Sequence, residues 1–231
     1  MSAELPQHAE IVIVGGGVAG TSLAWQLGRV GKTDVVLLER GTLTCGTSWH
    51  AAGLIMQLRS SHSLTDLSHA NAAAYETLAA ETDQETGFRQ NGTLAIARSE
   101  ERIHELKRYA TIAKTYGIEA DLISPREAKA LYPGLESSLV KAALYIPKDG
   151  QLNPVDTVMA FAAGARRLGT RIFEGCPASA IARPRGSGGY RVATPRGTIE
   201  CETLVLACGL WTRELAATLG AAVPLNPCEH F

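Results

Sequence analysis

Residues 11–20 read IVIVGGGVAG, and this stretch decides the fold. Its first four residues are a β-branched run that stops at three consecutive glycines, which is typical of a parallel strand buried on both faces. Apolar residues at helical spacing then predict a helix over Val18–Val30, with Gly31 as its stop signal. Val35–Leu38 predicts a second buried strand that ends at Glu39. A strand, a helix and a strand within about 30 residues predict a parallel sheet with a right-handed crossover.

Gly15, Gly17 and Gly20 match the spacing G-x-G-x-x-G where the first strand gives way to the helix. In this pattern the first glycine permits a tight turn, the second lets the backbone approach a diphosphate, and the third allows close helix packing. Glu39 follows 19 residues after Gly20. A carboxylate there accepts hydrogen bonds from ribose hydroxyls and disfavours a 2′-phosphate. We therefore favour a dinucleotide site over a purely structural glycine turn, and the pattern leaves FAD and NAD as alternatives.

Residues 46–54, GTSWHAAGL, favour a flavin over a nicotinamide. This stretch is rich in small residues and bracketed by Gly46 and Gly53, so the backbone can approach a large planar ligand closely. In a nicotinamide dehydrogenase the chain normally continues toward the next helix without such a loop. Taken alone, His50 is most often a hydrogen-bonded core histidine.

The composition is that of an ordinary globular protein with a small-molecule partner. The chain has 231 residues, 22 basic and 23 acidic side chains and a net charge of −1, which gives no general attraction to nucleic acid or anionic lipid. The longest apolar stretches, Ile11–Val18 and Leu204–Trp211, fall short of the roughly 20 residues that span a bilayer. The first ten residues contain no Lys or Arg, so we expect no leader, no membrane partner and a cytoplasmic location.

The five cysteines are odd in number, and no two have the spacing C-x-x-C. This pattern predicts reduced core thiols, with no metal site and no disulfide framework. The residues concerned are Cys45, Cys176, Cys201, Cys208 and Cys228.

Helix and strand patterns alternate through the rest of the chain. We expect helices over Ser63–Thr82 and Glu100–Tyr116, a capping box at Ser124–Glu127, and strands over Thr93–Ala97 and Val140–Ile146. Beyond Gly150 we expect a helix opened by Asn153 and Pro154, strands over Arg171–Glu174 and Leu204–Ala207, and a hairpin of Tyr190–Thr194 with Thr198–Cys201. The predicted organisation is a first part of the cofactor domain at 1–86, an inserted α+β segment at 87–150, a second part at 151–220, and the start of a further strand at 221–231.

These motifs resemble the glycine-oxidase-like FAD amine oxidoreductases, and particularly the dimethylglycine and sarcosine dehydrogenases. The resemblance covers nearly the whole chain through VGGGVAG at 14–20 with Glu39 and Arg40, GTSWHAAGL at 46–54, GCPA at 175–178 and LACGLW at 206–211. It implies an α/β, Rossmann-like FAD-binding domain with a parallel sheet, interrupted by part of an α+β substrate lobe. By the same resemblance, His50 is the point of covalent attachment to the flavin 8α carbon.

The resemblance also implies the residues that touch FAD. Ala178 would contribute backbone groups on the adenine side, and Trp211 would lie beside the cofactor, although a half-buried core aromatic is the alternative for Trp211. Cys208 is assigned to packing. The implied contacts are Val18, Ala19, Glu39, Arg40, Gly46, Thr47, Ser48, Trp49, His50, Ala51, Ala52, Gly53, Leu54, Ala178 and Trp211.

The resemblance implies oxidative demethylation of an N-methylglycine-type amine, such as dimethylglycine or sarcosine. A hydride would move from the N-methyl carbon to flavin N5, leaving an iminium that water or folate captures, and the acceptor for the flavin electrons would be oxygen or an electron-transfer flavoprotein. Residues 228–231 resemble the family's E-H-x-[YF] strand, which makes His230 the acid/base candidate, with an unpaired terminal histidine as an equal alternative. A tetrahydrofolate-binding domain would lie beyond residue 231.

Two other readings stay open. The rival is a non-catalytic fragment or a FAD-binding subunit that needs a partner chain, and a nicotinamide dehydrogenase is the third. An absorbance spectrum of the purified chain, with and without acid precipitation, separates them.

Overall fold

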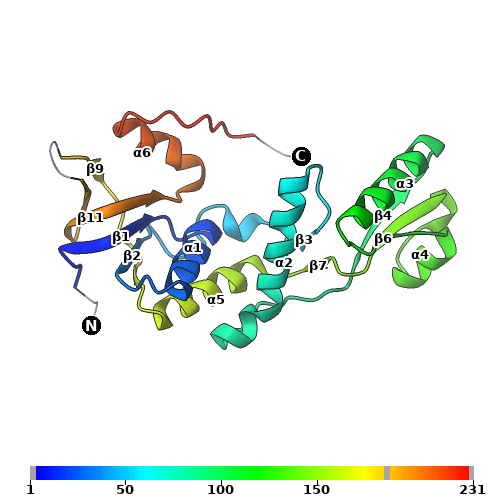
Figure 1. The fold of residues 1–231 in the computed structure, drawn as a ribbon, viewed down its shortest axis with the longest axis horizontal. Helices are drawn as coiled ribbons and strands as arrows, with labels where there is room; N and C mark the ends of the chain where they lie inside the picture. The colour runs from blue at the N-terminus through cyan, green and yellow to red at the C-terminus, as the bar shows by residue number, and fades with distance from the viewer. Residues whose placement is uncertain (1–3, 185–187, 229–231) are drawn as a thin grey trace. The chain divides into compact units, whose positions relative to one another are not determined.

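A computed structural model describes residues 4–184 and 188–228. The chain divides into two compact units (Figure 1). The first contains residues 1–51, 78–86 and 154–231, and the second contains residues 52–77 and 87–153. The predicted insertion at 87–150 lies within the second unit, which also includes 52–77. That the units bind cofactor and substrate respectively stays a prediction.

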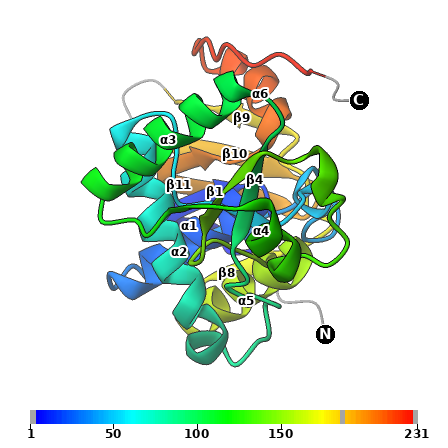
Figure 2. The ribbon, with the colours of Figure 1, turned by 90° about the vertical axis from the view of Figure 1, so that its right-hand side faces the viewer.

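The first unit is built on a six-stranded sheet with the order β8-β2-β1-β11-β10-β9. The strands are β8 (Arg171–Phe173), β2 (Val35–Leu38), β1 (His8–Val14), β11 (Gly197–Leu206), β10 (Tyr190–Thr194) and β9 (Ala180–Ala182). The first four are parallel, and β10 and β9 extend the sheet in antiparallel fashion. Figure 2 shows β9, β10, β11 and β1 following one another across it. The predicted α/β class and parallel sheet are confirmed.

Two helices of this unit, α1 (Val18–Arg29) and α5 (Pro154–Arg167), pack side by side (Figure 1). The ring of Trp25 on α1 lies 5.3 Å from that of Phe161 on α5, centroid to centroid. Gly164 makes this approach possible, because a Cβ on it would lie 2.6 Å from Cδ1 of Trp25. The remaining elements are the 3-10 turns η1 (Ser48–His50) and η3 (Gly209–Trp211) and the short helix α6 (Thr212–Thr218).

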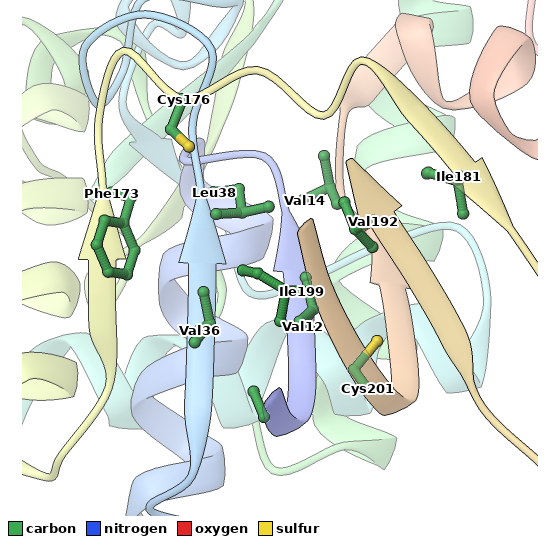
Figure 3. Packing of buried hydrophobic residues seen from close by; sticks show 11 residues of the cluster. Val12, Val14, Val36, Leu38, Phe173, Cys176, Ile181, Val192, Ile199 and Cys201 are labelled. Carbon is green, nitrogen blue, oxygen red and sulfur yellow. The ribbon is translucent and has the colours of Figure 1, made fainter. Parts of the chain in front are cut away.

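Side chains from all six strands form the core on one face of the sheet (Figure 3). β-branched and aromatic residues fill it, as expected for strands that are buried on both faces. Burying these apolar side chains fixes the register of β1, β2 and β11, so their carboxyl ends meet at one edge of the sheet. The cluster consists of Ala9, Val12, Val14, Val36, Leu38, Phe173, Cys176, Ile181, Val192, Ile199 and Cys201.

The second unit has a three-stranded antiparallel sheet with the order β4-β6-β5, and a two-stranded pair of β3 with β7. Ser124 starts helix α4 with the predicted capping box, because its hydroxyl and the Glu127 carboxylate exchange hydrogen bonds with each other's backbone N–H. The elements are β3 (Leu54–Ile55), most of α2 (His62–Thr82), β4 (Thr93–Ala97), α3 (Glu100–Thr115), β5 (Asp121–Ile123), α4 (Pro125–Leu131), η2 (Ser137–Leu139), β6 (Ala142–Ile146) and β7 (Gly150–Gln151).

The prediction of separate strands at Thr198–Cys201 and Leu204–Ala207 is wrong, because β11 runs without a break from Gly197 to Leu206. Residues 197–201 of β11 pair with β10 and residues 200–206 pair with β1, so Glu202 and Thr203 lie within one continuous strand. The sequence pattern also did not indicate β9, β5 and α6. Residues 221–228 form neither helix nor strand, and the rest of the strand predicted there, 229–231 with His230, lies outside the described residues.

The prediction of five core thiols is wrong for two of them. All five cysteines are free, and Cys176 and Cys201 are buried, but Cys45 and Cys228 are exposed and Cys208 is half-buried. Cys45 and Cys228 lie in irregular segments, whose exposure a cysteine count does not reveal. Within the described ranges, no helix is both long enough and apolar enough to cross a membrane.

Candidate functional site

The glycine turn between β1 and α1 leaves no room for side chains at two of its positions. Gly15 has a φ of 116°, and a Cβ on it would lie 2.4 Å from the carbonyl oxygen of Ala207. A Cβ on Gly20 would lie 1.9 Å from the carbonyl oxygen of Gly15, so the helix can begin this close to the strand only with glycine there. The backbone N–H of Gly15 donates to the Leu38 carbonyl at 2.8 Å, which joins the turn to the end of β2.

The N-terminus of α1 is bound by a side chain from a distant loop. Gly17, the N-cap, has no side chain to cap the helix, and the Val18 N–H donates to Oγ of Ser48 at 3.0 Å. A Cβ on Gly17 would lie 3.0 Å from the same Oγ. The first turn of α1 contains no acidic residue. This helix end therefore presents N–H groups and a partial positive charge, the two features that bind a phosphate.

The carboxylate of Glu39 lies at the carboxyl end of β2 and is 7% exposed. Its Oε2 accepts from the Gly16 N–H at 2.7 Å, and its Oε1 accepts from the Gly41 N–H at 2.9 Å and from the Cys45 thiol at 3.4 Å. A buried carboxylate needs such donors to compensate for lost hydration. Glu39 is thus rigidly placed, with its charge directed at the glycine turn.

These groups open on a cavity of about 500 Å³ that lies within the first unit. Eleven of the predicted site residues line it: Gly15, Gly17, Val18, Ala19, Glu39, Arg40, Gly46, Thr47, Ser48, Ala178 and Trp211. Ten further lining residues were not predicted as contacts: Val14, Leu38, Cys45, Pro177, Ala207, Cys208, Gly209, Glu214, Leu215 and Thr218.

Some of the lining residues that were not predicted could have been found from their positions relative to the strands. Val14 and Leu38 end parallel strands, and Ala207 directly follows one, and ligands in open α/β sheets bind outside the carboxyl ends of such strands. Glu214, Leu215 and Thr218 carry no such signal, because they come from α6, a short helix that the sequence pattern did not indicate.

Arg40 and Trp211 contact each other at the cavity wall. The guanidinium carbon of Arg40 lies 4.0 Å from the centroid of the Trp211 ring, which is a cation–π geometry. Trp211 is 39% exposed and lines the cavity, so a ligand in the cavity could contact it. The pair provides a flat aromatic surface and a positive charge on one side of the cavity.

Seven predicted site residues do not line this cavity. Gly20 is buried in helix packing, and Trp49, His50 and Ala51 follow Ser48 as exposed residues at η1, with the Trp49 and His50 ring centroids 3.6 Å apart. Ala52, Gly53 and Leu54 belong to the second unit, where Gly53 accepts a hydrogen bond from the Leu152 N–H at 2.9 Å. The structure therefore brings together the phosphate and ribose candidates, and places His50 just beyond them in the chain.

Two thiols of the cavity are held protonated. Desolvation raises the pKa of Cys208 to about 11, with the Glu39 charge as the next cause, and its thiol lies 3.1 Å from the Val14 carbonyl. Desolvation followed by the hydrogen bond to Glu39 raises the pKa of the Cys45 thiol. Neutral thiols are poor nucleophiles, so neither residue is suited to covalent catalysis. No group of three potential metal ligands occurs within residues 4–184 and 188–228.

This donor set fits a dinucleotide. A helix N-terminus with closely approachable backbone can hold the diphosphate, and a buried carboxylate can accept from a ribose.

Comparisons with known proteins agree with a dinucleotide-binding site. Residues 10–231 match the family described as FAD dependent oxidoreductase (DAO). The mitochondrial dimethylglycine dehydrogenase of Rattus norvegicus is 37% identical over 227 residues, which cover 98% of this chain and 26% of the relative. The 4-methylaminobutanoate oxidase (formaldehyde-forming) of Paenarthrobacter nicotinovorans is 38% identical over 227 residues, 98% of this chain and 27% of that protein.

Among solved structures, L-proline dehydrogenase from P. horikoshii superposes with a TM-score of 0.87 at 27% identity, over 94% of this chain and 57% of that one. The chain spans about a quarter of the length of the two curated relatives. The resemblance inferred from the sequence motifs is confirmed. The chain belongs to the FAD-dependent oxidoreductase (DAO) family.

Proposed function

We propose that the cavity of the first unit binds FAD. The diphosphate lies at the N-terminus of α1 against Gly17 and Val18, and the ribose hydroxyls of the adenosine donate to Glu39. Adenine lies beside Ala178, and Trp211 lies along the cofactor. One observation carries this proposal: the glycine turn and the buried Glu39 carboxylate open on the same cavity.

Hydrogen bonding supports this placement of the ribose. The Glu39 carboxylate already accepts from two backbone N–H groups and one thiol, and an ionised carboxylate has about four acceptor sites. The Cys45 contact is long and involves a weak donor, so a ribose hydroxyl can replace it at little cost. Glu39 then keeps its two backbone donors while it binds the cofactor.

Ser48 is the residue that supports placing the diphosphate at α1. Its hydroxyl binds the Val18 N–H, at the position where a phosphate oxygen is stabilised by a helix N-terminus. A hydroxyl can turn to donate, so Ser48 can hold a phosphate oxygen as well as the helix end.

We assign the whole protein to the oxidation of an N-methylglycine-type secondary or tertiary amine, such as dimethylglycine or sarcosine. The two curated relatives support this class, because the names of both refer to substrates with N-methyl groups. When bound, FAD supplies the two-electron acceptor, and the residues of this chain bind and orient it. Oxygen or an electron-transfer flavoprotein as acceptor, tetrahydrofolate in a further domain and a cytoplasmic location stay predictions, and the rat relative is described as mitochondrial.

We further assign His50 as the covalent attachment point for the flavin. Its support is local: η1 exposes His50 to solvent, and Ser48 at the start of the same turn lines the cavity. A flavin that extends from the diphosphate site past Ser48 would meet this turn. Trp49 stacks on the His50 ring and restricts its orientation.

The test is the absorbance of the purified 231-residue chain after incubation with FAD and gel filtration. We expect a flavin spectrum that comigrates with the protein and is lost when excess ADP is present, since ADP carries the diphosphate and the ribose. A chain that is folded and remains colourless would contradict the proposal and favour a non-catalytic polypeptide. Retention of NADH in place of FAD in the same assay would favour the nicotinamide alternative.

A further inference from the structure

The loop after β2, residues 40–45, is held against the segment that follows β8. We call it the β2 loop. Three backbone hydrogen bonds fix its beginning and the preceding residue, Glu39: Glu39 N–H to Phe173 O at 2.9 Å, Cys176 N–H to Glu39 O at 2.8 Å, and Gly175 N–H to Gly41 O at 2.7 Å. Farther along, the Leu43 N–H donates to Oε2 of Glu174 at 2.8 Å. A carboxylate thus provides a fourth fastening of this loop.

Glu174 also contacts two arginines. Its Oε1 lies 3.5 Å from a terminal nitrogen of Arg166 at the end of α5, and its backbone carbonyl accepts from Arg196 at 2.9 Å. The Glu174 and Arg166 side chains are 38% and 43% exposed, and such exposed ion pairs contribute little to stability. A hydrogen bond from an N–H to a charged carboxylate contributes more. The hydrogen bond from the Leu43 N–H is therefore the main stabilising interaction of the Glu174 carboxylate.

The β2 loop in turn holds the middle of the glycine turn. Leu43 is buried, and its Cδ2 lies 2.6 Å from where a Cβ on Gly16 would stand. The next residue, Thr44, donates its N–H to the Gly16 carbonyl at 3.3 Å and has a φ of 74°. A threonine in this left-handed region is strained and persists only when its surroundings fix it. The Leu43 anchor beside it supplies such a constraint.

The geometry points to Glu174 as a positioning residue for FAD binding, an inference that rests on the function proposed above. Through Leu43 and Thr44, the Glu174 carboxylate fixes Gly16 in the turn that receives the diphosphate. The same loop carries Cys45 to the carboxylate of Glu39. Glu174 does not line the cavity, so it acts through the loop without touching the cofactor.

The experiment compares FAD dissociation constants of the full 231-residue chain and four variants. We expect Glu174→Ala to weaken FAD binding about tenfold, which corresponds to losing roughly 1.4 kcal/mol. Glu174→Gln keeps an acceptor for the Leu43 N–H and should restore the affinity to within about threefold of wild type. Arg166→Gln removes the ion pair alone and should also stay within about threefold. Glu174→Asp keeps the charge but shortens the side chain, so it should also weaken FAD binding. It replaces Glu174→Ala as the test if that variant does not fold.

A second readout is the alkylation rate of Cys45 without ligand. Loosening the β2 loop should raise this rate severalfold in Glu174→Ala and leave the rate of exposed Cys228 unchanged. Wild-type FAD affinity in Glu174→Ala would overturn the inference, and so would an equal loss in Glu174→Gln. If wild type itself binds neither FAD nor ADP, the proposed function fails instead.

Discussion

The carboxylate of Glu39 accepts a hydrogen bond from the backbone N–H of Gly16 at 2.7 Å. This contact joins the end of β2 to the middle of the glycine turn after β1, across 23 positions of sequence. Parallel pairing of β1 with β2 sets Val14 opposite Leu38, and so brings the two strand ends together. The candidate ribose and diphosphate sites therefore share one hydrogen-bonded framework. A substitution in either site should alter ligand binding at the other.

Gly17→Val should abolish FAD binding and leave most of the fold intact. A Cβ at residue 17 would lie 3.0 Å from the Ser48 hydroxyl, and its methyl groups would fill the space assigned to the diphosphate. Gly188→Val is the matched control, because a Cβ at residue 188 would meet nothing within 4 Å. Equilibrium titration with FAD and thermal unfolding measure the two effects. A Gly17→Val chain with stoichiometric flavin would show that the diphosphate binds elsewhere.

Cys45 should report occupancy of the cavity. It is exposed and lines the cavity, so bound FAD or ADP should slow its alkylation by at least about tenfold, whereas Cys228, exposed and outside the cavity lining, should react at the same rate. The raised pKa of the Cys45 thiol means little thiolate at neutral pH, and the rate should rise as pH increases toward that pKa. Glu39→Gln should accelerate the reaction, because the Glu39 hydrogen bond contributes to the raised pKa. Peptide mass spectrometry after timed alkylation distinguishes the two thiols.

His50 should remain bonded to flavin after acid denaturation of the whole protein. A peptide that contains Trp49 and His50 should then carry the added flavin mass. His50→Ala should lose the covalent signal and still bind FAD noncovalently, since the glycine turn and Glu39 are untouched. In the 231-residue chain alone we expect weak or absent attachment, because covalent bonding requires a preassembled pocket. Complete release of flavin from the acid-treated whole protein would remove this assignment.

Asp149 should make the stability of the second unit depend on pH. It is 1% exposed, accepts from the Gln57 N–H at 2.9 Å and Thr93 Oγ1 at 2.6 Å, and desolvation raises its pKa from the ordinary 3.8. Because the Asp149 carboxyl binds its proton more tightly in the folded state, protonation stabilises the fold. This stabilisation is complete below pH 3.8 and is lost as the pH rises through the raised pKa. Asp149→Asn should remove this dependence. Urea unfolding measured across this pH range tests the prediction, with Asp121→Asn, an exposed carboxylate of the same unit, as the control. Parallel curves for wild type and Asp149→Asn would refute it.

The local parts of the site could be predicted from sequence because their physics is local. The β-branched run before Gly15 indicates a buried strand, the glycine spacing indicates the turn, and the distance to Glu39 follows from the length of one helix and one strand. Each of these signals lies within about 30 residues, where pattern and geometry are tightly coupled.

Contacts between distant segments could not be predicted in this way. Leu43 and Glu174 are 131 positions apart, and their hydrogen bond depends on β2 pairing with β8, which no periodicity reveals. The continuous β11 was not predicted because the polar residues Glu202 and Thr203 interrupt its apolar pattern, whereas in the structure Thr203 pairs with Ile11 of β1. The cavity-lining residues of α6 could not be predicted either, because α6 reaches the cavity only once the sheet has assembled.

The central claim is that one cavity holds the diphosphate and the ribose of FAD, with Glu39 at the ribose. Its most direct test is the displacement of FAD from the 231-residue chain by ADP and by ADP that carries a 2′-phosphate. We expect ADP to displace FAD and to bind at least about tenfold more tightly than its 2′-phosphate derivative, because two like charges meet at Glu39. Glu39→Gln should narrow this preference, and Glu200→Gln, on an exposed strand pair, should not. Equal affinity for the two ligands in wild type, or no displacement of FAD by ADP, would contradict the account.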